Sequence, residues 1–172
     1  MNQQRLKIYN GKILTPYRMI PQGTVLITDG IITEVTEGDI EVSDAIEINA
    51  NGNYISPGFI DIHVHGGGGH DFMDGSETAF LKAAETHARY GTTAMSPTTL
   101  TSEKKDLLNT LELYDKANKK NINGSQFLGM HLEGPYFAMN QRGAQDPRYI
   151  RDPDPEEYME VIASSNSIKR WS

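Results

Sequence analysis

Two histidines, His63 and His65, are the residues of this 172-residue chain whose type and spacing most directly indicate chemistry. They lie at the end of an apolar run, Phe59 to Val64, which stands between a Pro-Gly pair and four consecutive glycines. This pattern predicts a buried strand followed by a loop. Side chains at i and i+2 of a strand point the same way, so both imidazoles can offer nitrogen ligands to one divalent cation. The alternative is a hydrogen-bonded pair of surface histidines, but the flanking Pro-Gly and glycine run favour a metal site.

A second polar cluster ends a later predicted strand, Phe127 to Glu133. His131 and Glu133 share one face of that strand, whereas Met130 and Leu132 point towards helices. Glu133 can supply the oxygen ligand of a His/His/Glu set, or bridge two metals; alternatively, it caps the following loop. His131 is predicted to be a core residue or to orient a ligand.

The first third of the chain alternates short β-type runs with turns. Asn10-Gly11 is a strong hairpin signal, and Asp29-Gly30 and Asn51-Gly52 end two further runs. Four or five short strands of this kind predict a small antiparallel sheet or sandwich.

From Gly58 onward, predicted strands alternate with predicted helices. The helices cover residues 77–90, 102–120 and 155–163, and the strands cover 59–64, 92–96, 127–133 and the start of a fourth at 167–171. Ser76 is the expected cap of the first helix and Gly91 its stop. Three βα units in sequence predict parallel strands, in either a doubly wound sheet or a (β/α)8 barrel. Both polar clusters fall at the carboxyl ends of strands, where catalytic groups lie in a barrel.

Composition narrows the function classes. The formal net charge of −7 argues against nonspecific binding to nucleic acid. No apolar run approaches the roughly 20 residues that cross a bilayer, and the amino terminus has no signal-peptide core, so we expect a cytoplasmic protein without a membrane partner. The chain has no cysteine, so a metal must be held by nitrogen and oxygen. The glycine run at 66–69 lacks the Gly-Lys-Ser/Thr ending of a phosphate-binding P-loop.

The segment from Pro57 to Gly66 resembles the first-strand signature of the amidohydrolase superfamily. Together with the segments His131 to Tyr136 and Arg142 to Ala144, it is similar to the N-acetylglucosamine-6-phosphate deacetylase family. The similarity runs through essentially the whole chain. It implies an α/β fold: the front part of a metal-dependent (β/α)8 TIM-like barrel, truncated after three βα units and the start of strand 4 (residues 57–172), preceded by a small β-sandwich domain segment (residues 1–56).

The resemblance implies a hydrolase that converts N-acetylglucosamine 6-phosphate to glucosamine 6-phosphate and acetate in amino-sugar catabolism. Glu133 matches the principal metal ligand of the family, and His63 and His65 match positions that hold a further metal in some members. One or two divalent ions per subunit are implied, with zinc first and iron, cobalt or manganese as alternatives. Ala144 and Gln145 match substrate-contacting positions, although many members have a histidine in place of Gln145.

The remaining ligands of the family lie beyond Ser172, as do its catalytic aspartate and its phosphate-binding arginine. The isolated chain is therefore expected to be inactive. The family resemblance also implies that the full-length protein is a homodimer. His70 in the glycine-rich loop and His87 on a helix are not expected to replace the missing ligands. The other open interpretations are a cyclic amidase, which usually needs a carboxylated lysine at a strand end, and a noncatalytic fragment.

Overall fold

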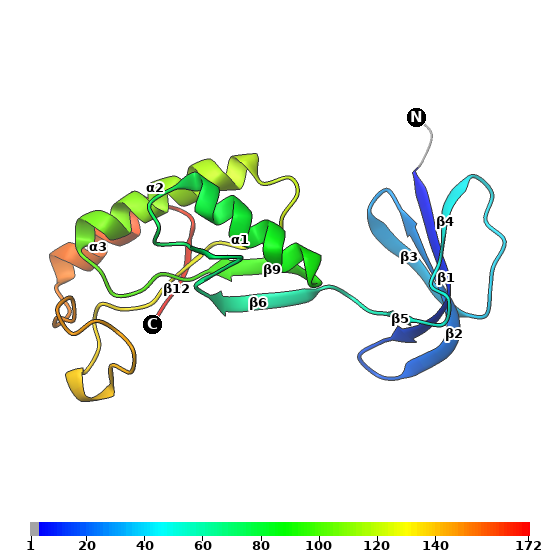
Figure 1. Cartoon of the computed structure of the whole chain (residues 1–172), viewed down its shortest axis with the longest axis horizontal. Helices are drawn as coiled ribbons and strands as arrows, with labels where there is room; N and C mark the ends of the chain where they lie inside the picture. The colour runs from blue at the N-terminus through cyan, green and yellow to red at the C-terminus, as the bar shows by residue number, and fades with distance from the viewer. Residues whose placement is uncertain (1–3) are drawn as a thin grey trace. The chain divides into compact units, whose positions relative to one another are not determined.

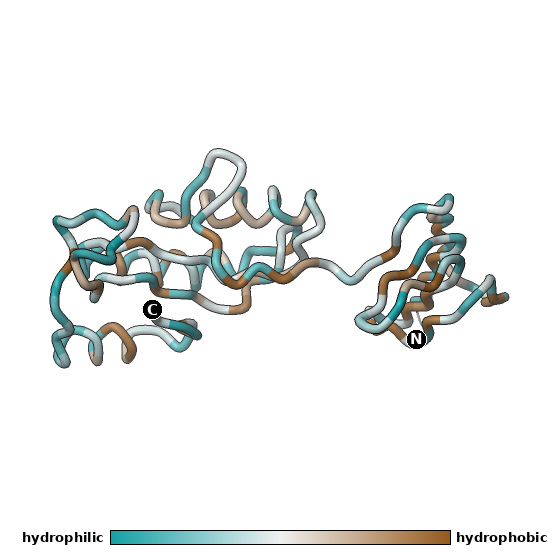
Figure 2. Tube along the Cα trace, turned by 90° about the horizontal axis from the view of Figure 1, so that it is seen from below, coloured by the Kyte–Doolittle hydropathy of each residue, from teal (hydrophilic) through white to brown (hydrophobic). Residues whose placement is uncertain are grey.

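The computed structural model describes residues 4–172, and the chain divides into two compact units, one ending at Pro57 and one running from Gly58 to Ser172 (Figure 1). In both units hydrophobic and hydrophilic stretches alternate along the trace (Figure 2). None of the helices among the described residues is long and apolar enough to span a membrane.

The first unit is a single five-stranded mixed sheet with the strand order β3-β2-β1-β4, in which β5 also pairs with β1. Its strands are β1 (Arg5–Leu14), β2 (Met19–Thr28), β3 (Ile31–Glu37), β4 (Ala45–Asn49) and β5 (Tyr54–Ile55). The first three strands are antiparallel neighbours, but β4 and β5 run parallel to β1. The expected antiparallel pairing is confirmed for β1 to β3 and is wrong for β4 and β5, because the chain passes from β3 to the other edge of β1 instead of turning back beside β3.

One predicted turn is confirmed and another is wrong. Asp29 and Gly30 have φ angles of 52° and 80° and join β2 to β3 as a two-residue hairpin. Asn10 also has a positive φ of 56°, but β1 continues through it with a register shift between Ile8 and Gly11. Asn10-Gly11 therefore forms a bulge, and the chain reverses after Leu14 instead, where Thr15 N–H donates to the carbonyl of Arg18 (3.0 Å).

The second unit contains three α-helices and several short parallel strand pairs. In chain order its elements are β6 (Phe59–Val64), β7 (Gly66–Gly67), β8 (His70–Asp71), α1 (Glu77–Arg89), β9 (Thr92–Pro97), α2 (Lys104–Lys120), β10 (Gln126–Phe127), β11 (Met130–Leu132), the 3-10 helix η1 (Met139–Gln141), α3 (Pro155–Ser164) and β12 (Ile168–Trp171). Strands β10, β9 and β6 form one parallel sheet, and β11 pairs in parallel with β12. Helices α1 and α2 lie on one side of β6 and β9 (Figure 1). The predicted α/β alternation is confirmed, and within residues 4–172 the strands do not close into a barrel.

Helix α1 forms where the sequence predicts it. The Ser76 hydroxyl accepts from Ala79 N–H (3.2 Å) at its start, and Gly91 follows its end with φ of 93°. The helix buries a small-residue face around Phe80, which lies in the core with Tyr114 of α2 and Phe127 of β10. This core holds α1 and α2 against the strands that carry the polar clusters.

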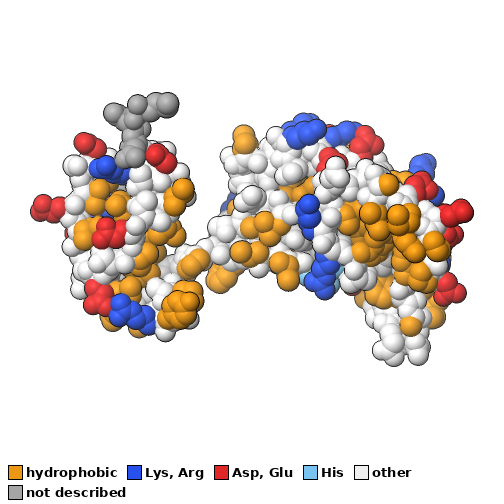
Figure 3. Space-filling view, turned by 180° about the vertical axis from the view of Figure 1, so that it is seen from behind, with side chains coloured by type: hydrophobic (Ala, Val, Ile, Leu, Met, Phe, Trp, Pro, Cys, Tyr) orange, Lys and Arg blue, Asp and Glu red, His pale blue; other side chains and the backbone are white. Residues whose placement is uncertain are grey.

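Two predictions about strands need correction. The strand expected over 127–133 is divided into β10 and β11, because Gly129 has φ of 125° and breaks the ladder between them. The strand β6 has the predicted bounds but is not buried: Phe59, Ile60 and Ile62 are 58–66% exposed. It is the edge strand of its sheet in the described chain, and hydrophobic side chains reach the surface of both units (Figure 3).

Candidate metal centre

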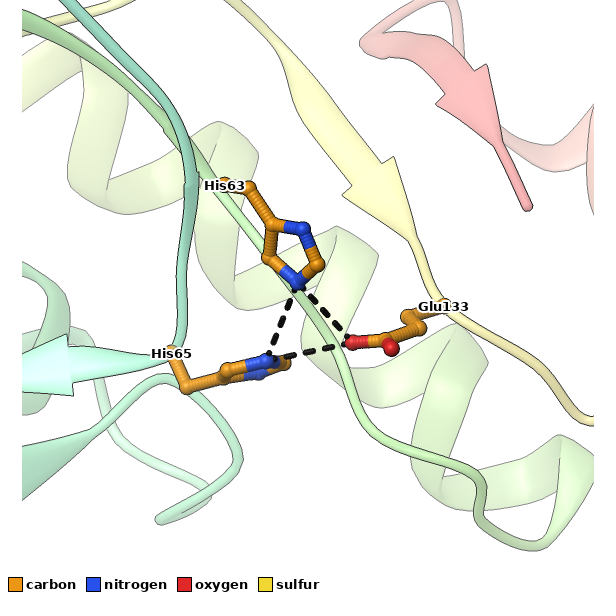
Figure 4. A group of neighbouring side chains, drawn as sticks. All are labelled: His63, His65 and Glu133. Atoms are coloured by element: carbon orange, nitrogen blue, oxygen red, sulfur yellow. Dashed lines mark hydrogen bonds and ion pairs between the residues drawn. The ribbon is translucent and has the colours of Figure 1, made fainter. Parts of the chain in front are cut away.

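The side chains of His63, His65 and Glu133 converge on one point (Figure 4). His63 lies near the end of β6, His65 directly follows that strand, and Glu133 directly follows β11. One carboxylate oxygen of Glu133, Oε2, lies 3.1 Å from Nε2 of His63 and 3.1 Å from Nε2 of His65. The two Nε2 atoms are 3.3 Å apart. The period of two in the strand thus aims both rings at a carboxylate 68 or more residues away in the sequence.

Hydrogen bonds alone cannot satisfy this triangle of atoms. If both Nε2 atoms carry protons and donate to Glu133, the two N–H groups face each other at 3.3 Å. If one Nε2 is unprotonated and accepts from the other, its lone pair faces the carboxylate oxygen at 3.1 Å. One pair is repulsive in either arrangement, and a cation in the middle makes all three contacts favourable.

The separations also fit a tetrahedral cation. Bonds of about 2.0–2.1 Å from a zinc-like ion to nitrogen and oxygen place neighbouring tetrahedral ligands about 3.3–3.4 Å apart. The observed separations are 3.1, 3.1 and 3.3 Å. The side chains of His63 and His65 are 44% and 35% exposed and that of Glu133 is 19% exposed, so a fourth position is open to water or substrate. The usual partner for the second ring nitrogen is missing at His65, whose Nδ1 is buried without a hydrogen bond among the described residues.

His131 lies beside this group and is buried, at 1% exposure. Its ring makes an edge contact with that of His63, with 4.8 Å between centroids, and its Nε2 is 2.8 Å from the Ser172 hydroxyl. Burial lowers the pKa of His131, and the charge of Arg170 lowers this pKa further. A buried ring that packs against a candidate ligand agrees with its predicted place in the core or behind the ligands.

The other sequence-predicted residues lie outside the three-ligand group. Ala144 is exposed on the segment that follows η1. Gln145 is buried, at 6% exposure, and its Oε1 accepts from Thr101 N–H (2.8 Å). Nδ1 of His70 lies 4.0 Å from Asp74, and Nε2 of His87 donates to the carbonyl of Gly66 (2.9 Å).

Sequence reasoning missed Thr98 and Thr99, which contact the segments carrying all three ligands. The Thr98 hydroxyl accepts from Val64 N–H (3.1 Å), and the Thr99 hydroxyl accepts from Glu133 N–H (3.1 Å). The available signal was a run of hydroxyl residues directly after Pro97, at the carboxyl end of a predicted parallel strand. The strand predicted from the sequence ends at residue 96, and Thr98 and Thr99 were assigned no role.

The arrangement of parallel strands and candidate metal ligands agrees with the comparison with known proteins. The model of the amidohydrolase family matches residues 54–170, which is more than half of the chain. The chain belongs to the amidohydrolase family.

Individual relatives within this family have more specific names than the family itself. The chain is 35% identical over 158 residues to an N-acetylglucosamine-6-phosphate deacetylase of Bacillus subtilis (89% of this chain, 40% of the relative). It is 30% identical over 159 residues to an N-acetylgalactosamine-6-phosphate deacetylase of Escherichia coli O157:H7 (92% of this chain, 41% of the relative). The crystal structure of an N-acetylglucosamine-6-phosphate deacetylase from Pasteurella multocida superimposes with a TM-score of 0.87 and 25% identity, over 97% of this chain and 44% of that one. The chain thus spans about two fifths of the length of these relatives.

Proposed function

We propose that the protein, at its natural full length, hydrolyses the acetamide of N-acetylglucosamine 6-phosphate to glucosamine 6-phosphate and acetate. The observation that carries this proposal is the convergence of His63, His65 and Glu133 within 3.3 Å of one another, in a chain similar to deacetylases of such phosphosugars. The relatives' names describe deacetylation of an amino-sugar phosphate, and we propose that this protein has that role in amino-sugar catabolism.

In this proposal the two histidines and the glutamate contribute differently to the binding of the cation. The two imidazoles bind the cation as neutral nitrogen donors. Glu133 adds a negative charge that offsets part of the positive charge of the cation. When bound, the cation supplies Lewis acidity towards the amide carbonyl and lowers the pKa of a water molecule. Glu133 is committed to the cation, so another carboxylate must take the water proton and deliver it to the leaving amine. We assign that step to an aspartate beyond Ser172.

The remaining features of the proposal concern the complete protein. We propose that further strands complete a (β/α)8 barrel around β6, β9 and β11, and that the sheet of the first unit is one part of a sandwich. Ala144 and Gln145 are the candidate sugar contacts. Gln145 can donate through its amide nitrogen, and its Oε1 already accepts one hydrogen bond, from Thr101 N–H. Zinc is the first choice of metal, and the full-length protein is proposed to be a cytoplasmic homodimer.

Acetate release tests the reaction. The full-length protein, loaded with zinc, is expected to release acetate from N-acetylglucosamine 6-phosphate, and the metal-stripped protein is not. The same assay with N-acetylgalactosamine 6-phosphate tests a second candidate substrate, which the Escherichia coli relative favours. Ring opening of a cyclic amide such as dihydroorotate, without acetate release from either sugar, would replace the proposal with a cyclic amidase.

Acetate release by the 172-residue chain alone can be compared with that by the full-length protein. It carries the three candidate ligands but not the proposed aspartate, so we expect it to release no acetate. Turnover by this chain would show that the proton-transfer group lies within the first 172 residues.

A further inference from the structure

We propose that Thr98 and Thr99 are positioning residues of the metal centre. Thr98 fixes the main chain between His63 and His65, and Thr99 fixes the main chain at Glu133. The inference rests on the proposed metal site and concerns residues that neither touch the cation nor offer it a ligand atom. Both side chains are buried, at 0% and 1% exposure, and both residues follow β9 directly.

Thr98 holds the histidine pair through the residue between its members. Its main-chain N–H donates to the carbonyl of Val64 (2.8 Å), and its hydroxyl accepts from the N–H of Val64 (3.1 Å). Val64 lies between His63 and His65, so these two bonds fix the main chain from which both imidazoles project. The same hydroxyl lies 3.1 Å from the carbonyl of Ser96 and 3.3 Å from Nδ1 of His131, and its single proton goes to one of these two acceptors.

Thr99 holds the glutamate in the same manner. Its main-chain N–H donates to the carbonyl of His131 (3.0 Å), and its hydroxyl accepts from the N–H of Glu133 (3.1 Å). The two threonines therefore make the same pair of contacts, Thr98 to the strand on one side of β9 and Thr99 to the strand on the other.

Side-chain hydroxyls are needed here because regular strand pairing fails at this end of the sheet. The β6–β9 ladder shifts register between Asp61 and Val64, and β9 meets β11 only through an isolated bridge from Thr98 to His131. Main-chain N–H groups in a packed interior need acceptors, and at Val64 and Glu133 the hydroxyls supply them. Regular strand pairing thus ends next to the candidate ligands, and hydrogen bonds from the main chain to the Thr98 and Thr99 hydroxyls replace it there.

Substitution by valine tests this assignment, because it keeps the shape of threonine and removes the hydroxyl. We would titrate Co²⁺ into the full-length protein and follow its visible absorption, using Thr98→Val and Thr99→Val with Thr98→Ser and Thr99→Ser as rescue variants. Partners that orient metal ligands typically contribute about 10–100-fold to metal affinity, so each valine variant should bind Co²⁺ at least about 10-fold more weakly, with an altered spectrum. The serine variants should recover most of the affinity.

Thr110→Val is the matched control. Thr110 is also buried, at 2% exposure, and its hydroxyl donates to the carbonyl of Asp106 within α2 (2.8 Å), away from the ligands. This variant should bind Co²⁺ as the unmodified protein does. Equal losses of affinity in the control and in the Thr98 and Thr99 variants would overturn the proposal, because general destabilisation would then explain both.

Amide hydrogen exchange provides a readout that needs no metal. Thr98→Val should accelerate exchange at Val64 and spare Glu133, and Thr99→Val should do the reverse. Folded valine variants with unchanged exchange and unchanged Co²⁺ affinity would refute the positioning role alone, leaving the proposed function intact. If the unmodified protein binds no Co²⁺ or Zn²⁺, the proposed function fails and the positioning role fails with it.

Discussion

Glu157 of α3 forms an ion pair with Arg151. The Arg151 guanidinium donates to both carboxylate oxygens and also to the carbonyls of Ser102 (3.2 Å) and Tyr149 (2.9 Å), so it joins the start of α2 to α3. The hydrogen bonds from Arg151 lower the pKa of Glu157 below its ordinary value.

This lowered pKa predicts a pH-dependent contribution to stability. A carboxyl group whose pKa is lower in the folded state stabilises the fold above its unfolded pKa of about 4.3, and this contribution disappears as the pH falls through the folded pKa. Glu157→Gln should therefore reduce the free energy of unfolding by about 1 kcal/mol at pH 7, and the difference from the unmodified protein should vanish in acid. Urea unfolding at several pH values measures it. Glu160→Gln, which breaks an exposed pair with Lys104, should cost less, and an equal, pH-independent loss in both variants would contradict the assignment.

At the residue scale, the sequence predicted that His63, His65 and Glu133 lie together, and it did not predict the contacts of the two threonines. The period of two in a strand places His63 and His65 on one side, and the carboxyl ends of parallel strands bring Glu133 to them. The roles of Thr98 and Thr99 depend on where two neighbouring ladders lose their register, which is set by long-range pairing and leaves no local pattern.

Gly129 is the point at which one expected strand becomes two elements. Its φ of 125° is strained for other residues, and a Cβ added there would lie 2.8 Å from the carbonyl oxygen of Ser167. Gly129→Ala should therefore lower the free energy of unfolding by about 2–4 kcal/mol, as the sum of backbone strain and crowding. Gly75 also has a positive φ, of 69°, but an added Cβ there has no heavy atom within 4 Å. Gly75→Ala should cost only about 1 kcal/mol in the same urea experiment, and equal losses would contradict the account of Gly129.

At the element scale, local signals predicted helices better than strand pairing. Helix α1 was recognisable because its cap, apolar face and glycine stop are all encoded within a few residues. The turn at Asn10-Gly11 was wrong because the left-handed conformation that favours a hairpin also suits a bulge. Whether a hairpin or a bulge forms depends on β2 and β5, which pair with β1.

At the scale of the whole molecule, the two units differ in how much apolar surface they bury. Among residues 4–172, the core of the second unit is built from thirteen buried residues, whereas that of the first has three, Ile13, Ile20 and Val25. Large hydrophobic side chains stay exposed on β3 and β4 as well as on β6. The sequence could not predict this exposure, since an apolar strand signals burial without saying which part of the protein covers it. In the proposed complete protein, further strands and helices cover these surfaces.

The central claim is that His63, His65 and Glu133 hold the cation on which hydrolysis depends. It is tested most directly by measuring metal content and acetate release from N-acetylglucosamine 6-phosphate in the full-length protein, unmodified and with Glu133→Gln. Loss of the carboxylate charge should lower metal affinity by more than the about 10–100-fold that outer partners contribute, and turnover should fall with it. Glu34→Gln, the same change at an exposed position of β3, should alter neither quantity. Full metal content and normal acetate release in the Glu133→Gln protein would contradict the account.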